Sequence, residues 1–145
     1  MYSYAYPRPA LTADCVVFST GGPAGNMVLL VRRGNEPFKG RWALPGGFMD
    51  MDETLEQCAR RELKEETGIV APPGLEEVGS FSTVDRDPRG RTVTVAFVAV
   101  VPCTEAHGGD DACDARWFPL GEIPPLAFDH EAILHKAAAL KGFVL

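Results

Sequence analysis

The sequence lacks cysteines at the paired spacing of a metal site. Its four cysteines are scattered, with no C-x-x-C motif: Cys15, Cys58, Cys103 and Cys113. A zinc site made of Cys103, His107 and Cys113 would need a spacing that matches no common zinc motif. Cys15 and Cys58 occupy apolar positions, where cysteine acts as a small hydrophobe. We therefore expect no zinc centre, and a protein of the reduced cytoplasm.

A net positive charge, membrane segments and repeats are also missing. The formal net charge is −6, so no basic field attracts nucleic acid. The N-terminus has neither the basic start nor the apolar run of a secretory signal, and no segment is long enough to span a membrane. Without a repeat or a visible domain boundary, we expect residues 1–145 to form one cytoplasmic domain that binds neither nucleic acid nor a membrane.

Short apolar runs between turn residues predict a series of strands. They cover residues 14–19, 27–33, 41–44, 76–84, 91–101 and 115–118. Residues 92–101 carry apolar side chains on both faces, which is typical of a central strand covered on both sides. Asp129 is placed to cap a last helix that runs to about Leu140. The alternating tyrosines of residues 2–6 predict either an arm that docks on the domain or on a second subunit, or a loose terminus.

A dense group of acids stands out in this background. Glu62, Glu65 and Glu66 place three carboxylates within little more than one helical turn, where like charges repel one another. Hard divalent cations prefer clustered oxygen ligands of this kind. The cluster therefore predicts a metal site, with a solvated acidic helix face as the alternative.

Local signals place this cluster on a helix over residues 55–67. Thr54 and Gln57 form a capping box, and Gly68 supplies the left-handed stop. At about 100° per residue, Glu62 and Glu66 fall within the apolar stripe of this helix, among Leu55, Cys58, Ala59 and Leu63. A helix that only packed against a core would carry Leu or Ala there. The position of the acids therefore favours a functional site over a solvated face.

Residues 47–69 resemble the signature of a known family. The Nudix box is G-x5-E-x7-R-E-U-x-E-E-x-G-U, where U is a bulky aliphatic residue. Every fixed position is matched, by Gly47, Glu53, Arg61, Glu62, Leu63, Glu65, Glu66, Gly68 and Ile69. The resemblance implies a Nudix-type α/β/α sandwich with a mixed β-sheet. It also implies a hydrolase that cleaves the diphosphate bond of nucleoside diphosphate derivatives with Mg²⁺ or Mn²⁺.

A wider resemblance bears on the substrate. Four stretches are similar to the small bacterial and archaeal ADP-ribose pyrophosphatases: Y-P-R-P-A-L-T-A-D, P-F-K-G-R-W-A-L-P-G-G, D-R-D-P-R-G-R and L-A-F-D-H. This similarity implies a homodimer that converts ADP-ribose to AMP and ribose 5-phosphate. One alternative substrate is an oxidised nucleoside triphosphate, a dinucleotide or a nucleotide sugar.

The same stretches also resemble the sensor domain of Nudix-related transcriptional regulators, which binds ADP-ribose without cutting it. Those regulators often have a degraded box and carry a DNA-binding domain after it. Because this chain keeps every box position and ends soon after its last predicted helix, we favour the enzyme.

The resemblance implies a role for each residue of the box. Glu62 and Glu66 are the expected metal ligands, joined by a backbone carbonyl from the Pro45-Gly46-Gly47 turn, for which Gly46 is the candidate. Glu65 is expected to bind a second ion or activate water. Glu53 is expected to ligate through water or to act as a base. Arg61 is expected to hold a catalytic glutamate by a salt bridge, with a plain surface ion pair as the alternative.

Two loops complete the predicted site. The general base of such enzymes often follows the central strands, where this chain has Glu105, Asp110 and Asp111. The alternatives there are a solvated acidic turn, or a base supplied by the box. The second loop places arginines in an otherwise acidic chain, and guanidinium groups suit diphosphates. We expect it to contact substrate through Asp85, Arg86, Arg89 and Arg91, with a charged hairpin tip as the alternative.

Overall fold

The computed structural model describes residues 1–104 and 112–145. In this part of the chain, seven strands form one mixed sheet with two helices. The elements in chain order are β1 (Ala10–Gly22), β2 (Gly25–Arg33), β3 (Trp42–Ala43), β4 (Gly46–Phe48), α1 (Leu55–Thr67), β5 (Glu76–Phe81), β6 (Thr92–Pro102), β7 (Ala112–Pro119) and α2 (His130–Lys141). None of the helices described is long and apolar enough to cross a membrane.

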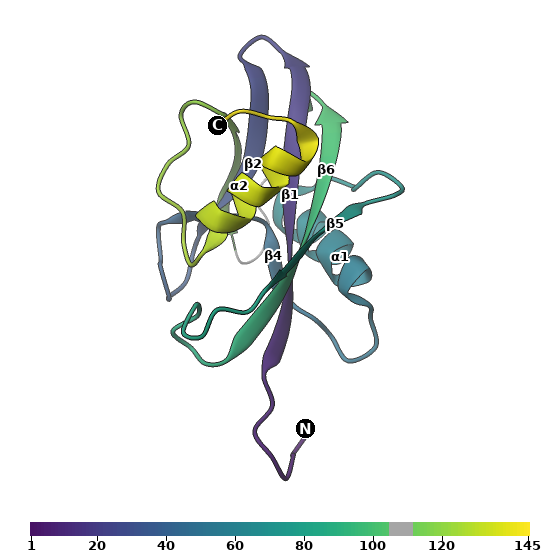
Figure 1. Ribbon diagram of the computed structural model, residues 1–145, viewed down its shortest axis with the longest axis vertical. Coiled ribbons are helices and arrows are strands. Elements are labelled where there is room, and N and C mark those ends of the chain that lie inside the picture. The colour runs from purple at the N-terminus through teal and green to yellow at the C-terminus, as the bar shows by residue number, and fades with distance from the viewer. Residues whose placement is uncertain (105–111) are drawn as a thin grey trace.

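The sheet is built around a long parallel pair. β1 and β6 pair in parallel from Ala10 and Thr92 to Thr20 and Pro102. The other pairs are antiparallel, in the order β3-β2-β1-β6-β5, with β4 added to β1 and β7 to β2. Figure 1 shows β1 and β6 running side by side through the middle of the molecule. The mixed sheet that the family resemblance implies is confirmed.

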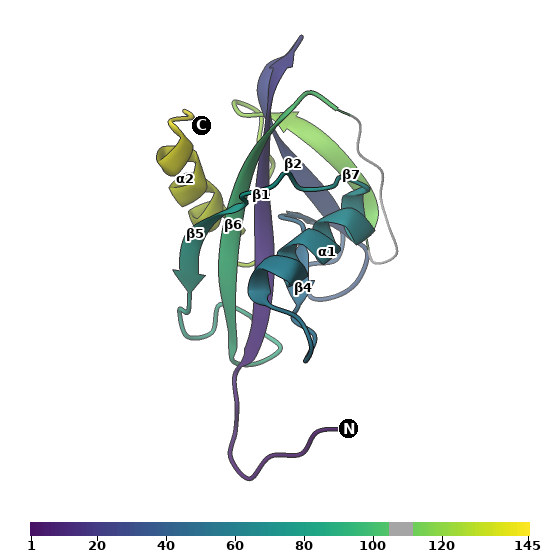
Figure 2. The same cartoon turned by 90° about the vertical axis from the view of Figure 1, so that its right-hand side faces the viewer.

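The two helices cover opposite faces of this sheet, as Figure 2 shows edge-on. Because side chains alternate along a strand, β1 supplies Cys15 and Val17 to a cluster with α1, and Val16 and Phe18 to a cluster with α2. β6 does the same, with Phe97 and Ala99 on one side and Ala96 and Val98 on the other. The predicted α/β/α layering and the doubly covered strand are therefore confirmed.

Helix α1 follows its local signals. The Thr54 hydroxyl accepts a hydrogen bond from the Gln57 N–H, and the Gln57 side chain accepts one from the Thr54 N–H. Gly68 ends the helix in the left-handed conformation, with φ 78°. The buried residues of α1 are Cys58, Ala59, Leu63 and Thr67. The predicted bounds of this helix are confirmed.

The structure corrects two predictions, one at the expected glycine turn and one at the second helix. Residues 46–48 form the short strand β4, paired with β1, where we expected a turn. Asp129 occupies the N-cap position of α2 but makes no side-chain cap hydrogen bond. Its carboxylate accepts two hydrogen bonds from Arg86 instead. Residues 2–6 form no strand and are exposed, as a loose terminus would be.

Candidate active site

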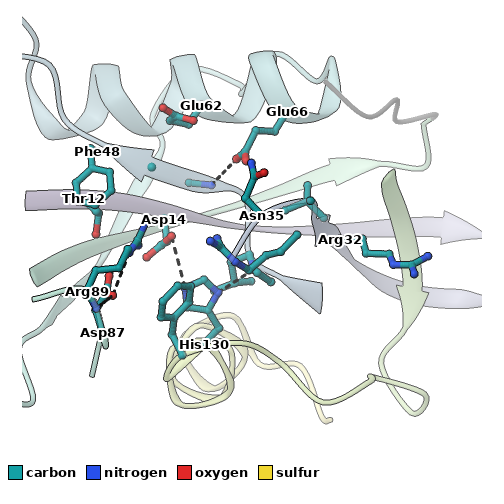
Figure 3. Close-up of a pocket in the computed structure, with 18 of the residues that line it drawn as sticks. Thr12, Asp14, Arg32, Asn35, Phe48, Glu62, Glu66, Asp87, Arg89 and His130 are labelled. Carbon is teal, nitrogen blue, oxygen red and sulfur yellow. Dashed lines mark hydrogen bonds and ion pairs between the residues drawn. The ribbon is translucent and has the colours of Figure 1, made fainter. Parts of the chain in front are cut away.

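One pocket opens at the end of the sheet beside α1. It lies between two walls of opposite character, as Figure 3 shows. Glu62 and Glu66 project from α1 on one side, and Arg89, Asp87 and His130 lie across from them. The acidic wall comes from the box helix. The opposite wall is assembled from the end of β2, the loop after β5 and the start of α2.

The two glycines of β4 let this strand approach the acidic wall closely. The Gly46 N–H donates a hydrogen bond of 2.8 Å to Glu66 Oε1. A Cβ atom on Gly47 would lie 2.6 Å from Glu62 Cδ, which is much closer than ordinary van der Waals contact. A side chain at position 47 would therefore fill the space that the Glu62 carboxylate occupies. This close packing explains why position 47 needs glycine.

Arg61 is the centre of the acidic cluster. Its guanidinium is 2.7 Å from carboxylate oxygens of both Glu53 and Glu62, and 3.2 Å from one of Glu65. It also lies 3.5 Å from Asp50 Oδ2. Arg61 thus contacts four carboxylates, two in the loop before α1 and two on α1 itself. This network brings Arg61 to the predicted glutamates, and its role in holding a catalytic glutamate stays a prediction.

These contacts set the protonation states around Arg61. Hydrogen bonds from Arg61 lower the pKa of Glu53 to about 2, so Glu53 is ionised at neutral pH. Hydrogen bonds with Glu53 raise the pKa of Arg61 above its usual value. Burial, together with the charge of Glu53, raises the pKa of the neighbouring Cys58 thiol to about 12. Cys58 therefore stays protonated and is a weak nucleophile.

The acidic wall has the chemistry of a hard-cation site. Glu62 is mostly buried, with its side chain 16% exposed, whereas Glu65 is 52% exposed. Glycine at position 47 lets the Glu62 carboxylate lie close against the strand, and carboxylate oxygens suit divalent ions. The residues present therefore fit a divalent metal. In the described ranges 1–104 and 112–145, no group of three His, Cys, Asp or Glu side chains is already arranged as a ready-made metal site.

The arginine loop (residues 85–91) brings only some of its predicted substrate-contacting residues to the pocket. Arg86 and Arg89 line it, together with Asp87. Arg89 pairs with the buried Asp87 at 2.8 Å, and its guanidinium lies over the rings of Phe48 and Phe128. Burial opposes ionisation of Asp87, but hydrogen bonds from Arg89 outweigh it and keep its pKa below the usual value.

Two of the expected loop residues are not among the pocket residues: Asp85 and Arg91. Asp85 is exposed and has a positive φ of 66°. Arg91 donates to the Thr83 carbonyl at 3.4 Å and is exposed as well. Contact of these two residues with substrate stays a prediction. The predicted base candidates Glu105, Asp110 and Asp111 lie outside the described residues.

The pocket residues that sequence reasoning missed include Asp14, Arg33 and His130. Asp14 is buried and accepts a hydrogen bond of 2.6 Å from the Thr94 hydroxyl. His130 is also buried, and its Nδ1 accepts the Leu44 N–H at 3.0 Å. Burial lowers the pKa of His130. One signal was available, because an aspartate within the apolar run 14–19 breaks the strand pattern.

Arg33 is half-buried at the end of β2. Its Nε donates to the Pro37 carbonyl at 2.7 Å, and its guanidinium lies 5.0 Å from the centre of the Phe128 ring. Burial lowers its pKa, and the nearby Arg89 lowers it further. No carboxylate among the described residues lies within ion-pair distance of Arg33. Arg33 lines the pocket, and the charges of Glu66, Asp87 and Asp14 act to raise its pKa.

Comparisons with known proteins identify the family. A NUDIX domain model matches residues 8–137, and the chain belongs to the Nudix family. An ADP-ribose pyrophosphatase of Methanocaldococcus jannaschii is 43% identical over 129 residues, which are 89% of this chain and 73% of the relative. The ADPR responsive transcriptional repressor NtrR of Acinetobacter baylyi is 40% identical over 92% of this chain. The match spans only 55% of that repressor.

Solved structures agree on the fold. The NUDIX domain of Shewanella oneidensis NrtR, complexed with ADP ribose, has a TM-score of 0.87 and 39% identity, with 94% of this chain and 91% of that chain covered. A bifunctional NMN adenylyltransferase/ADP ribose pyrophosphatase of Francisella tularensis, complexed with AMP and Mn ion, has a TM-score of 0.82 and 31% identity. The match covers 96% of this chain and 43% of that one. A divalent metal is therefore found in a solved relative.

Proposed function

We propose that this protein hydrolyses the diphosphate bond of ADP-ribose to AMP and ribose 5-phosphate, with Mg²⁺ or Mn²⁺ as cofactor. The observation that carries the proposal is the pocket itself, in which a carboxylate wall faces an arginine wall. A diphosphate between two sugars needs both, because one wall holds the metal and the other offsets the charge on phosphate oxygens. The 43% identity to an ADP-ribose pyrophosphatase supports the substrate.

Each wall has its own task in this mechanism. Glu62 and Glu66 would hold the metal, with Gly46 beside them. A metal bound there would supply a water of lowered pKa and neutralise phosphate charge. Arg61 fixes Glu62 and Glu53 in place through hydrogen bonds of 2.7 Å. Arg33 and Arg89 line the far wall, where guanidinium groups can bind phosphate oxygens, and Arg86 is nearly buried against Asp129.

The general base must be a group that can take a proton from water, and the candidates in this chain are carboxylates. Glu53 is a weak candidate, because its hydrogen bonds with Arg61 hold its pKa at about 2. We therefore expect the base to be Glu65, which is half exposed, or one of the loop acids outside the described residues. Single replacements by the amide at positions 65, 105, 110 and 111 separate these candidates. The variant that lacks the true base should lose kcat while keeping its affinity for ADP-ribose.

The decisive experiment is a panel of nucleoside diphosphate derivatives with Mg²⁺ or Mn²⁺, with products identified by chromatography. The panel includes ADP-ribose, a dinucleotide, a nucleotide sugar and an oxidised nucleoside triphosphate. ADP-ribose should give the highest kcat/KM, and Glu66→Gln should abolish most of its turnover. If ADP-ribose ranks below several others, the proposed substrate is wrong. If Glu66→Gln works as fast as the parent, the metal assignment is wrong.

The second candidate is a sensor that binds ADP-ribose without cutting it. It is favoured by the similarity to an ADPR responsive repressor and to the ADP-ribose complex of an NrtR domain. Tight calorimetric binding of ADP-ribose with no turnover under any divalent ion would establish the sensor. The homodimer that the family resemblance implies stays a prediction, and light scattering measures it.

A further inference from the structure

Two consecutive residues at the start of α2 are bonded to opposite parts of the pocket. Asp129, at the N-cap, reaches the arginine loop, and His130, in the first turn, reaches Leu44 between β3 and β4. The next turns of α2 are fixed in the core by Ile133 and Leu134, which are fully or almost fully buried. The first turn of this helix is therefore a rigid link between two segments that are far apart in sequence.

The bond to the arginine loop is a partly buried ion pair. Arg86 donates from Nε and from a terminal nitrogen to the two oxygens of Asp129, at 2.9 and 2.6 Å. The Arg86 side chain is only 4% exposed. Asp129 forgoes the hydrogen bond that would cap its own helix, which typically contributes about 1 kcal/mol. A two-point charged contact of this kind fixes both the distance and the orientation of the loop.

The hydrogen bond between His130 and Leu44 is buried. His130 Nδ1 accepts the Leu44 N–H at 3.0 Å, two residues before Gly46. Asp14 lies directly behind Gly46, and its Oδ1 is 3.7 Å from His130 Nε2. On the other side of the strand, the Gly46 N–H is bonded to Glu66. The backbone around Gly46 is thus held by His130 at Leu44 and by Glu66 at Gly46 itself.

We propose that Asp129 and His130 are positioning residues that couple the arginine wall to the carboxylate wall, so that substrate affinity and metal affinity depend on each other through α2. This inference rests on the proposed function for its two ligands. Neither residue needs to touch the reacting atoms. A shift of the arginine loop pulls on Asp129, the helix start moves as one unit with His130, and the Leu44–Gly46 backbone follows, with the contact of Gly46 to Glu66.

Crossed measurements on two variants test the coupling. Asp129→Asn weakens the link to the arginine loop, and His130→Leu removes the acceptor for the Leu44 N–H. For each variant we would measure KM for ADP-ribose and the Mn²⁺ concentration that gives half-maximal activity. Coupling predicts that Asp129→Asn raises the Mn²⁺ constant, and that His130→Leu raises KM, each by about 3- to 10-fold.

Three controls separate this effect from a general loss of structure. His130→Asn keeps an acceptor near Nδ1 and should return both constants to within about 2-fold of the parent. Glu76→Gln breaks the ion pair with Lys141 at the far end of α2 and should change neither constant. Thermal melting without ligand monitors folding of every variant. If His130→Leu fails to fold, the Mn²⁺ constant of Asp129→Asn decides alone.

The coupling is refuted if each variant changes only the constant of its own wall, that is, KM alone for Asp129→Asn and the Mn²⁺ constant alone for His130→Leu. The same comparison by calorimetric binding of ADP-ribose and Mn²⁺ does not need turnover. If the parent binds both ligands but cuts nothing, the proposed activity fails, while the crossed binding constants still decide the coupling. The two proposals can therefore fail separately.

Discussion

Replacing Gly47 by alanine tests the acidic wall at one atom. The new Cβ would lie 2.6 Å from Glu62 Cδ and 2.7 and 2.8 Å from its two oxygens, whereas ordinary contact begins at 3.4 Å. The Glu62 carboxylate must therefore retreat by about 0.8 Å, and a misplacement near 1 Å in an active site can lower the rate about 100-fold. We expect kcat for ADP-ribose to fall about 10- to 100-fold and the half-activating Mn²⁺ concentration to rise.

Stability should respond differently from activity, because the Glu62 side chain can move while the backbone stays in place. An alanine in place of glycine also restricts the unfolded chain, which adds about 0.4–1 kcal/mol of stability where the backbone tolerates it. We therefore expect thermal melting of Gly47→Ala to stay close to that of the parent. Gly121→Ala is the matched control, since no atom lies within 4 Å of its added Cβ. If Gly47→Ala keeps parental kcat and parental Mn²⁺ activation, the assignment of Glu62 to the metal is wrong.

The other predictions concern the ion pairs and the core. Ionised Glu53 stabilises the fold above its unfolded pKa, near 4.5, and this contribution disappears as pH falls through about 2; the melting difference between parent and Glu53→Gln should therefore shrink between pH 4.5 and 2, and a constant difference would contradict it. Arg89→Lys should raise KM for ADP-ribose about 3- to 10-fold by losing the planar fork, whereas Arg91→Lys, outside the pocket residues, should leave KM unchanged; equal effects would refute this division of the loop. Leu63 is fully buried on the inner face of α1, so Leu63→Ala should lower the free energy of unfolding by about 2–5 kcal/mol in urea titrations. Leu140 is half exposed; a loss for Leu63→Ala no larger than that for Leu140→Ala would show that the α1 face is loosely packed.

The carboxylate wall could be predicted from sequence because all its determinants are local. The capping box, the glycine stop and the acids at 62, 65 and 66 belong to one helix and one short loop, and helical periodicity alone orients them. Even Arg61 meets two of its four carboxylate partners on the same helix and the other two in the loop just before it. The strand β4 escaped prediction for the opposite reason. Its three residues include two glycines, which have little strand propensity, and only pairing with β1 makes them a strand.

The facing wall could not be predicted, because its residues are defined by partners far along the chain. Asp129 looked like a helix cap, since the local rule favours aspartate there. Arg86, 43 residues earlier, competes for the same carboxylate and wins with two charged hydrogen bonds. Within one loop, the same composition sends Arg86 inward and Arg91 outward, and no local pattern distinguishes them. In this protein, sequence therefore predicts where the metal is expected, whereas the proposed substrate wall is built from contacts that only the folded chain brings together.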